Sequence, residues 1–151
     1  MDFSFLSKYW PYYLEGMKNT VLLALVTVLL GGLVGLLLVL GRISRRRSLR
    51  FLAGAYVEFV RGTPLLVQLF IIYYGLPALG IRFYDNVIVS TALGISLPEF
   101  IPGVIALGLN SGAYVCEIFR SGIQSIDNGQ TEAARSLGLS HRQTLQYIIF
   151  P

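Results

Sequence analysis

A single uncharged run near the amino terminus constrains this chain more than any other feature. From Asn19 to Gly41 there are 23 consecutive residues without a charge, and the run is rich in Leu and Val. About 20 apolar residues suffice for a helix to cross the hydrocarbon core of a bilayer. The run therefore predicts a membrane-spanning helix over 19–41. No small-residue cleavage site follows it, so we expect this helix to be retained rather than removed as a signal peptide.

A second span is predicted over 52–81, where residues 62–81 form an uncharged run of 20. This span contains a helix breaker. Pro64 lacks a backbone N–H donor, and it disfavours the helical conformation at Thr63. We therefore expect a local break at this point, and inside a membrane the backbone groups freed by a break need partners in the protein or water.

A third span is predicted over 100–123. Its uncharged part, residues 100–116, has 17 residues, which is at the lower end of the range for a spanning helix, so the helix must continue through Glu117. Residues 82–99 carry several charges and are expected to form an external loop with an interfacial or packed piece. These patterns predict an all-α fold, a polytopic transmembrane helical bundle with three spans.

Composition agrees with a membrane protein and excludes several classes. The chain of 151 residues is 54% apolar and 13% charged, whereas soluble domains carry about 25% charged residues. A disordered chain is excluded on this ground, and an ordinary soluble enzyme is not expected. The one cysteine, Cys116, excludes an internal disulfide and a Cys-based metal site. Common enzyme motifs are absent. We therefore expect no enzymatic activity, no metal and no cofactor.

The basic residues predict the orientation of the chain. Five of the twelve lie within nine residues, between the first and second predicted spans. Loops rich in Arg and Lys stay on the cytoplasmic side of a membrane. We therefore expect the N-terminus and residues 82–99 outside and residues 125–142 inside. A nucleic-acid partner is not expected, because these charges form one short cluster rather than a face. The cluster consists of Arg42, Arg45, Arg46, Arg47 and Arg50.

Residues 1–18 differ from the spans. Aromatic and aliphatic residues recur there at helical spacing and are interrupted by charges. Two interpretations remain open, a periplasmic segment lying at the membrane interface and an ordinary amphipathic helix packed on the rest of the chain.

Four ionisable residues lie in or near predicted spans. They form two pairs at i,i+3 spacing, Glu58 with Arg61 and Glu117 with Arg120. Charged groups within a membrane are costly and usually face the bundle interior or a water-filled path. One hypothesis makes them a substrate pathway or gate, and Thr63 at the expected break supports it because transporter sites often use interrupted helices. The alternative is a structural ion-pair network near the cytoplasmic ends of the spans.

The polar tail has the pattern of two short helices. Thr131 is expected to cap a helix that begins Glu132-Ala133-Ala134, and Gly138 is a suitable residue to end it. Ser140 and Gln143 form a capping-box pattern that opens a further helix.

These tail residues carry a family resemblance. Glu132-Ala133-Ala134, Gly138 and Ile148-x-Phe150-Pro151 resemble the EAA loop of ATP-binding-cassette importer permeases, EAA-x3-G-x9-I-x-L-P, with Phe150 in place of Leu. Two further blocks resemble the polar amino acid permeases of that group. They are Arg61-Gly62-Thr63-Pro64-Leu65-Leu66-Val67-Gln68-Leu69-Phe70 and Ala113-Tyr114-Val115-Cys116-Glu117-Ile118-Phe119-Arg120-Ser121-Gly122-Ile123, the second followed by Gly129-Gln130.

The resemblance implies a permease subunit in the bacterial inner membrane that moves polar amino acids. Its implied partners are ATPase subunits, a second permease subunit and an extracytoplasmic amino-acid-binding protein. It implies that the ATPase hydrolyses ATP and docks on a coupling helix at Glu132, Ala133, Ala134 and Gly138. It also adds Gln68 to the candidate pathway residues.

Two rival functions remain open, a membrane anchor without a transport path and a small channel. The amino acid transported and the choice between a homodimer and a heterodimer are also open. We expect residues 19–151 to form a permease domain that is incomplete at its C-terminus, because related permeases continue through further spans.

Overall fold

The computed structural model describes residues 4–84 and 86–149, and every regular element in these ranges is helical. The predicted all-α class is thereby confirmed. The elements in chain order are α1 (Ser4–Arg42), α2 (Arg47–Gly62), α3 (Leu65–Phe70), the π-helical turn η1 (Ile71–Gly75), α4 (Leu76–Ala78), α5 (Val87–Leu93), α6 (Leu97–Gln124), α7 (Asn128–Ser136), α8 (His141–Thr144) and the π-helical turn η2 (Leu145–Ile149).

Two helices of the described chain are long and apolar enough to cross a membrane, α1 over Lys8–Arg42 and α6 over Leu97–Gln124. A third candidate is the pair formed by α2 and the helical segment Leu65–Ala78, which are bent by 104° relative to one another. Length and composition therefore allow two or three spans. The exact span limits stay a prediction.

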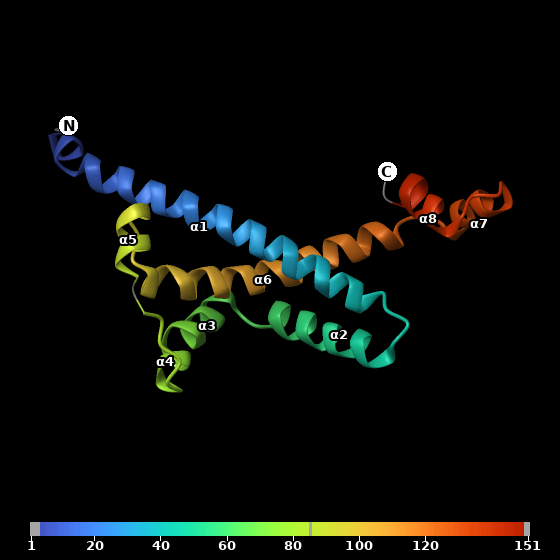
Figure 1. Ribbon diagram of the computed structural model, residues 1–151, viewed down its shortest axis with the longest axis horizontal. Helices are drawn as coiled ribbons and strands as arrows, with labels where there is room; N and C mark the ends of the chain where they lie inside the picture. The colour runs from blue at the N-terminus through green and yellow to red at the C-terminus, as the bar shows by residue number, and fades with distance from the viewer. Residues whose placement is uncertain (1–3, 85, 150–151) are drawn as a thin grey trace.

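The long helices α1 and α6 cross one another and stay in contact over several turns (Figure 1). Two pairs of glycines allow their backbones to approach. A Cβ built on Gly35 would lie 2.5 Å from Val115 and 3.0 Å from the carbonyl oxygen of Gly112, and one on Gly31 would lie 3.4 Å from that of Gly108. The Gly31/Gly35 and Gly108/Gly112 pairs thus face each other, which is the way small residues bring membrane helices together.

A small apolar core joins three helices near the end of α1 where α2 begins. The buried side chains come from α1, α2 and α6, and they are Val39, Val57, Val60, Ala113 and Cys116. The hydroxyl of Tyr56 on α2 also donates to the carbonyl oxygen of Leu109 on α6 at 3.0 Å. Cys116 is therefore a small buried side chain of the helix interface.

The predicted helix break at Pro64 is confirmed. α2 ends at Gly62, and Thr63 and Pro64 have extended backbone angles before α3 begins at Leu65. The range 52–81 is accordingly built from separate helices.

The amino-terminal helix has no boundary at residue 18, because α1 runs unbroken from Ser4 to Arg42. Its exposed aromatic residues include Tyr9, Trp10, Tyr12 and Tyr13. The interfacial location of residues 1–18 stays a prediction, and residues 1–3 lie outside the described range.

The expected external segment 82–99 contains the short helix α5, capped by the side chain of Asn86, and the first turn of α6. α6 begins at Leu97, ahead of the predicted start at residue 100, and Pro98 in its first turn is well suited to a helix start. Asp85 lies outside the described residues.

The polar tail forms a separate helical hairpin beyond α6, in which α7 packs against α8 and η2 (Figure 1). This hairpin and the loop between α1 and α2 lie at the same end of the molecule. That arrangement fits the expectation that both face one side of the membrane.

Candidate functional site

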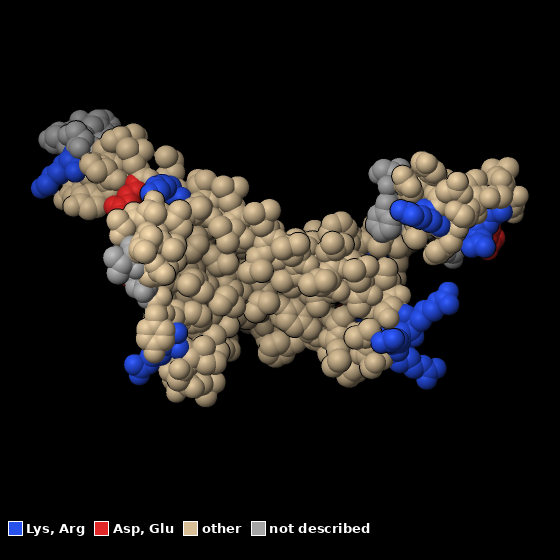
Figure 2. All heavy atoms as spheres, in the orientation of Figure 1, with Lys and Arg blue, Asp and Glu red and all other residues tan. Residues whose placement is uncertain are grey.

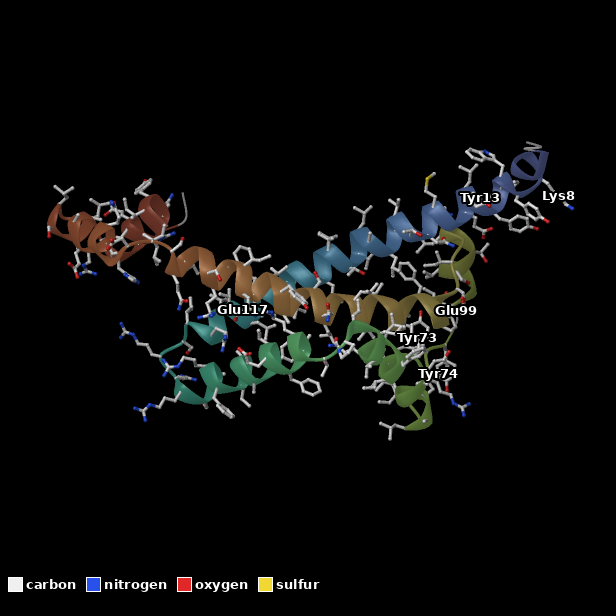
Figure 3. All side chains as sticks on the ribbon, turned by 180° about the vertical axis from the view of Figure 1, so that it is seen from behind. Lys8, Tyr13, Tyr73, Tyr74, Glu99 and Glu117 are labelled. Carbon is white, nitrogen blue, oxygen red and sulfur yellow. The ribbon has the colours of Figure 1, made fainter. Side chains whose placement is uncertain are left out.

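Glu117 is the centre of an ion-pair cluster that joins three helices. Its carboxylate lies 2.9 Å from the guanidinium of Arg42 on α1 and 3.0 Å from that of Arg120 on α6. Arg61 on α2 lies 3.7 Å from Oε2 of the same carboxylate, the oxygen that Arg120 also contacts. The Glu117 side chain is 14% exposed, so this carboxylate is largely removed from solvent while it holds α1, α2 and α6 together (Figure 3). We call these residues, with Glu58, the Glu117 cluster.

The predicted pairing at i,i+3 holds for Glu117 with Arg120 and is wrong for Glu58 with Arg61. Among the described ion pairs, Arg61 contacts Glu117, and Glu58 contacts Arg42 at 3.7 Å. The Glu58 side chain is 74% exposed. The reason is geometric, because α2 packs against α6 with Arg61 toward Glu117 and leaves Glu58 at the surface.

Arg42 is a member of this site that was not identified from the sequence. It was grouped with the loop arginines, yet it is the last residue of α1 and its side chain is 17% exposed. The only signal in the sequence was its position directly after the uncharged run, which places it on the helix rather than in the loop.

The Glu117 cluster brings three guanidinium groups to two carboxylates. Arg61 is its most exposed arginine, at 41%, and it also lies over the ring of Tyr114 at 5.5 Å from the centroid. Such a cation–π contact adds to the attraction of an incompletely solvated arginine. These contacts show that the cluster links α1, α2 and α6. Arg61 is the arginine of the cluster whose side chain is most accessible to solvent.

The two remaining pathway candidates, Thr63 and Gln68, close the helix break. The side-chain Nε2 of Gln68 donates to the carbonyl oxygen of Val60 at 2.8 Å and to the hydroxyl of Thr63 at 2.7 Å. The hydroxyl of Thr63 donates to the carbonyl oxygen of Phe59 at 3.0 Å. These bonds satisfy carbonyl groups that Pro64 leaves without helical donors, as a break in an apolar medium requires.

Asn110 on α6 completes this arrangement, donating from its side-chain nitrogen to the side-chain oxygen of Gln68 at 3.1 Å. This residue was not singled out from the sequence. A lone amide within the third predicted span was the available signal, because polar groups inside spans usually find partners on neighbouring helices.

A cavity of about 220 Å³ lies toward the other end of α6, and its lining combines polar side chains with the apolar side chains of Leu23, Ile95 and Phe100. Its lining includes Asn19 and Thr20 from α1, Tyr73 from η1 and Glu99 from α6. The Tyr73 hydroxyl donates to the backbone oxygen of Glu99, and Figure 3 shows the two residues together. The side-chain oxygen of Asn19 is buried without a hydrogen-bond partner. This cavity was also missed from sequence, since its residues come from three distant segments.

The residues of the predicted docking helix lie on α7. Glu132 and Ala133 are exposed, whereas Ala134 is 4% exposed. Because α7 packs against α8 and η2, Ala134 contributes to the interior of the hairpin. Glu132 and Ala133 are thus the part of the Glu-Ala-Ala motif that is open to a partner.

Gly138 ends α7 as expected, with a positive φ of 87°. The N–H of Leu139 donates to the carbonyl oxygen of Ala134 at 3.1 Å, and the N–H of Gly138 donates to that of Arg135 at 3.0 Å. These two bonds form the Schellman motif, which requires a left-handed residue that glycine adopts without strain. The predicted capping box of Ser140 and Gln143 is also confirmed.

The start of α7 differs from the prediction. Thr131 lies inside the helix, and the N-cap is Asp127, whose carboxylate accepts the N–H of Gly129 at 2.7 Å. An Asp cap is at least as favourable as a Thr cap, so the helix extends one turn further toward its N-terminus.

Leu137 is an exposed apolar residue on the same hairpin. Its side chain is 81% exposed, and it follows Ala133 by four positions, which places both on one side of the helix end. A large apolar side chain exposed at the end of the polar helix α7 is the type of residue that enters a partner's pocket. The last motif residues, Phe150 and Pro151, lie outside the described range.

The arrangement of crossed helices and polar hairpin agrees with that of a known family. Residues 27–151 match the family model described as "Binding-protein-dependent transport system inner membrane component". The chain belongs to this family. The family description names an inner membrane component, so the chain is an integral membrane protein, and the predicted family resemblance is confirmed.

Individual relatives agree with the family. The chain is 42% identical over 142 residues to the probable amino-acid ABC transporter permease protein YckA of Bacillus subtilis, covering 94% of this chain and 57% of that protein. It is 38% identical over 151 residues to the arginine transport system permease protein ArtQ of the same organism, covering 100% of this chain and 63% of ArtQ.

A solved structure is similar over the whole described fold. It is the crystal structure of an amino acid ABC transporter with histidines, with a TM-score of 0.78 and 41% identity. The match covers 100% of this chain and 64% of that chain. This chain therefore spans somewhat less than two thirds of the length of the relatives that it matches.

Proposed function

We propose that this chain acts as a permease subunit of an ATP-binding-cassette importer for polar amino acids. The observation that carries the proposal is the family match over residues 27–151. The names of YckA and ArtQ refer to amino acids, and the similar solved structure is that of an amino acid transporter. These relatives support the substrate class without selecting one amino acid.

The α7–α8 hairpin is proposed to receive the ATPase subunit. Three side chains on the hairpin are exposed to solvent: the carboxylate of Glu132, the small side chain of Ala133 and the large apolar side chain of Leu137. The capping of both helices makes the hairpin a compact unit at the end of α6. A movement of the ATPase would therefore pass through this hairpin to α6 and to the helices fastened to it.

The proposed orientation places this hairpin and the arginine-rich loop in the cytoplasm and the cavity around Asn19 toward the outside of the inner membrane. The positive-inside rule supports this orientation. An extracytoplasmic binding protein and a second permease subunit complete the proposed assembly.

The Glu117 cluster is proposed to hold the cytoplasmic ends of α1, α2 and α6 in place. The Glu117 carboxylate and the side chains of Thr63 and Gln68 are engaged by other groups of the chain, and the Nε of Arg42 is buried without a hydrogen-bond partner. The cavity around Asn19 and Tyr73 is the candidate that we propose for contact with a polar solute, because it combines an open volume with a buried Asn19 oxygen that has no hydrogen-bond partner.

The proposal is tested by uptake into vesicles that contain the full-length permease with its ATPase and binding protein. We expect uptake of a radiolabelled polar amino acid that depends on ATP. Asn19→Leu should reduce uptake while ATPase association persists, with Gly16→Ala as the control, because that position on α1 is outside the cavity lining and has no atom within 4 Å of an added Cβ. ATP-independent flux would indicate a channel, and an absence of any ATPase in the complex would indicate an anchor.

A further inference from the structure

Four arginines that the fold does not use lie in the loop between α1 and α2 and in the first turn of α2, which we call together the basic loop. Arg45, Arg46, Arg47 and Arg50 are all exposed, and none takes part in an ion pair among the described residues. Figure 2 shows basic side chains gathered over the end of the molecule where α1 and α2 meet. This concentration of positive charge exceeds what Glu58 and Glu117 can balance, because those carboxylates already contact Arg42, Arg61 and Arg120.

An apolar groove lies directly beneath these arginines, between α1 and α2. It has a volume of about 440 Å³, and its lining includes Leu37 and Gly41 from α1 and Leu49, Leu52 and Tyr56 from α2. Leu49 is the immediate neighbour of Arg50 in the chain, so the groove begins at the level of the basic loop. It continues along α1, which is a candidate membrane span, and along α2, which is part of the bent candidate pair.

The loop itself combines charge with exposed apolar side chains. Ile43 and Phe51 are 50% and 73% exposed, next to the arginines on either side. Such a mixture is suited to the boundary between headgroups and acyl chains, where arginine stems lie along apolar surface and the guanidinium groups reach the polar layer. The first turn of α2, which begins at Arg47, contains no acidic residue.

We propose that the basic loop and the groove below it form a binding site for one anionic phospholipid. The phosphate of the headgroup is held by Arg45, Arg46, Arg47 and Arg50, and an acyl chain occupies the groove lined by Leu37, Leu49 and Leu52. Basic clusters immediately cytoplasmic to a membrane helix attract anionic lipids, and guanidinium groups bind phosphate oxygens in pairs. The site rests on the proposed orientation, in which this loop lies at the cytoplasmic surface.

A lipid fits these observations better than an acidic protein. An acidic partner would account for the arginines alone, whereas the groove is apolar and runs from the arginines along the membrane helices. A phospholipid has both parts, a negative headgroup and an apolar chain, in the order in which the protein presents them.

The experiment measures lipid retention by the purified full-length permease in detergent micelles doped with phosphatidylglycerol or phosphatidylcholine. Native mass spectrometry counts the lipids that remain bound. We expect the wild-type protein to retain phosphatidylglycerol in preference, with a preference that falls as salt is raised because the attraction is electrostatic. This measurement needs no transport activity, so it is independent of the proposed function. Equal retention of both lipids by the wild-type protein would overturn the proposal.

Variants separate the headgroup contacts from the groove. The variant with Arg45→Gln, Arg46→Gln, Arg47→Gln and Arg50→Gln should lose the preference, by about five-fold for each charge removed. Leu49→Trp fills the groove and keeps the arginines, so it should weaken retention of long-chain phosphatidylglycerol more than that of a short-chain form. The matched control is Arg82→Gln, which removes an exposed arginine at the other end of the molecule and should change nothing.

The same variants distinguish the alternative occupant. If the four-fold Gln variant keeps its lipid preference and loses its association with the ATPase, the arginines bind an acidic protein surface and the lipid site is refuted. Because loop arginines also orient a membrane chain, the Arg→Lys variant of all four positions is made in parallel. It keeps the charge and should keep most of the phosphatidylglycerol preference, and its loss of that preference would contradict a site based on charge.

Discussion

At the scale of single residues, Glu117 takes part in more ion pairs than any other side chain in the described part of the chain. One carboxylate forms ion pairs with three arginines from three helices. Sequence spacing identified Glu117 and Arg120, since both lie on one helix. It did not identify Arg42 as their partner, because the approach of α1 to α6 depends on packing between segments 75 residues apart.

Replacement of Glu117 should destabilise the permease far more than replacement of Glu58. Glu117→Gln leaves Arg61 and Arg120 without a carboxylate and leaves Arg42 with only its 3.7 Å contact to Glu58, at a cost of about 1–3 kcal/mol after allowance for solvent at the arginines. Glu58→Gln is the matched control, since that side chain is 74% exposed and its loss should cost below about 0.5 kcal/mol. Thermal unfolding of the two proteins in detergent compares them, and equal midpoints would refute the central role of Glu117.

Gly138 gives a second prediction at this scale. Gly138→Val places a β-branched residue at a φ of 87°, which costs about 1–2 kcal/mol, whereas Gly138→Asn is better tolerated there. A Cβ added at this position would meet no atom within 4 Å outside the adjacent residues, so the effect comes from the backbone alone. Hydrogen exchange of the α7 amides should be faster in the Val variant than in the Asn variant. Similar protection in both would show that the left-handed turn is unimportant.

At the scale of elements, the crossing of α1 and α6 shows how far a motif can be interpreted. Each pattern of two glycines four apart was visible in the sequence, but such patterns are common in glycine-rich spans. They form an interface because they face each other, so that a Cβ added to Gly35 would lie 3.0 Å from the carbonyl oxygen of Gly112. By contrast, the break at Pro64 could be predicted, because it follows from the covalent structure of proline.

Two glycines on α1 predict different outcomes for the same substitution. Gly35→Ala puts a Cβ 2.5 Å from Val115, so α1 and α6 must separate, at a cost of about 1–3 kcal/mol. Gly32→Ala is the control, since nothing lies within 4 Å of that position. Thermal unfolding of both variants in detergent should place Gly32→Ala at or above the wild type and Gly35→Ala well below it. The reverse order would mean that α1 and α6 do not cross at these residues.

At the scale of the whole molecule, the class of the protein was predictable and the arrangement of its polar groups was not. Runs without charge and the placement of the arginines sufficed for an all-α membrane chain with a polar tail. The prediction that α7 begins after Thr131 was wrong. Two possible capping residues, Asp127 and Thr131, precede the Glu-Ala-Ala motif, and the helix is capped by Asp127. The cavity around Asn19 could not be foreseen, since it is assembled from α1, η1 and α6.

The central claim is that the hairpin of α7 and α8 docks the ATPase. In the proposed orientation this hairpin lies on the cytoplasmic side of the membrane, and α4 lies toward the opposite side. Glu132→Arg, which reverses an exposed charge on this hairpin, should weaken that association without affecting the folding of the permease. A reversal at Glu15, exposed on α1 far from the hairpin, is the control.

The most direct measurement of this claim is site-specific cross-linking in the assembled transporter. A photoreactive cross-linker is attached to a cysteine at Leu137→Cys, which is 81% exposed in the wild type, or at Leu79→Cys, which is 79% exposed near the other end. We predict an adduct with the ATPase subunit from position 137 and none from position 79. An ATPase adduct from position 79, or none from position 137 in a complex that hydrolyses ATP, would contradict the account.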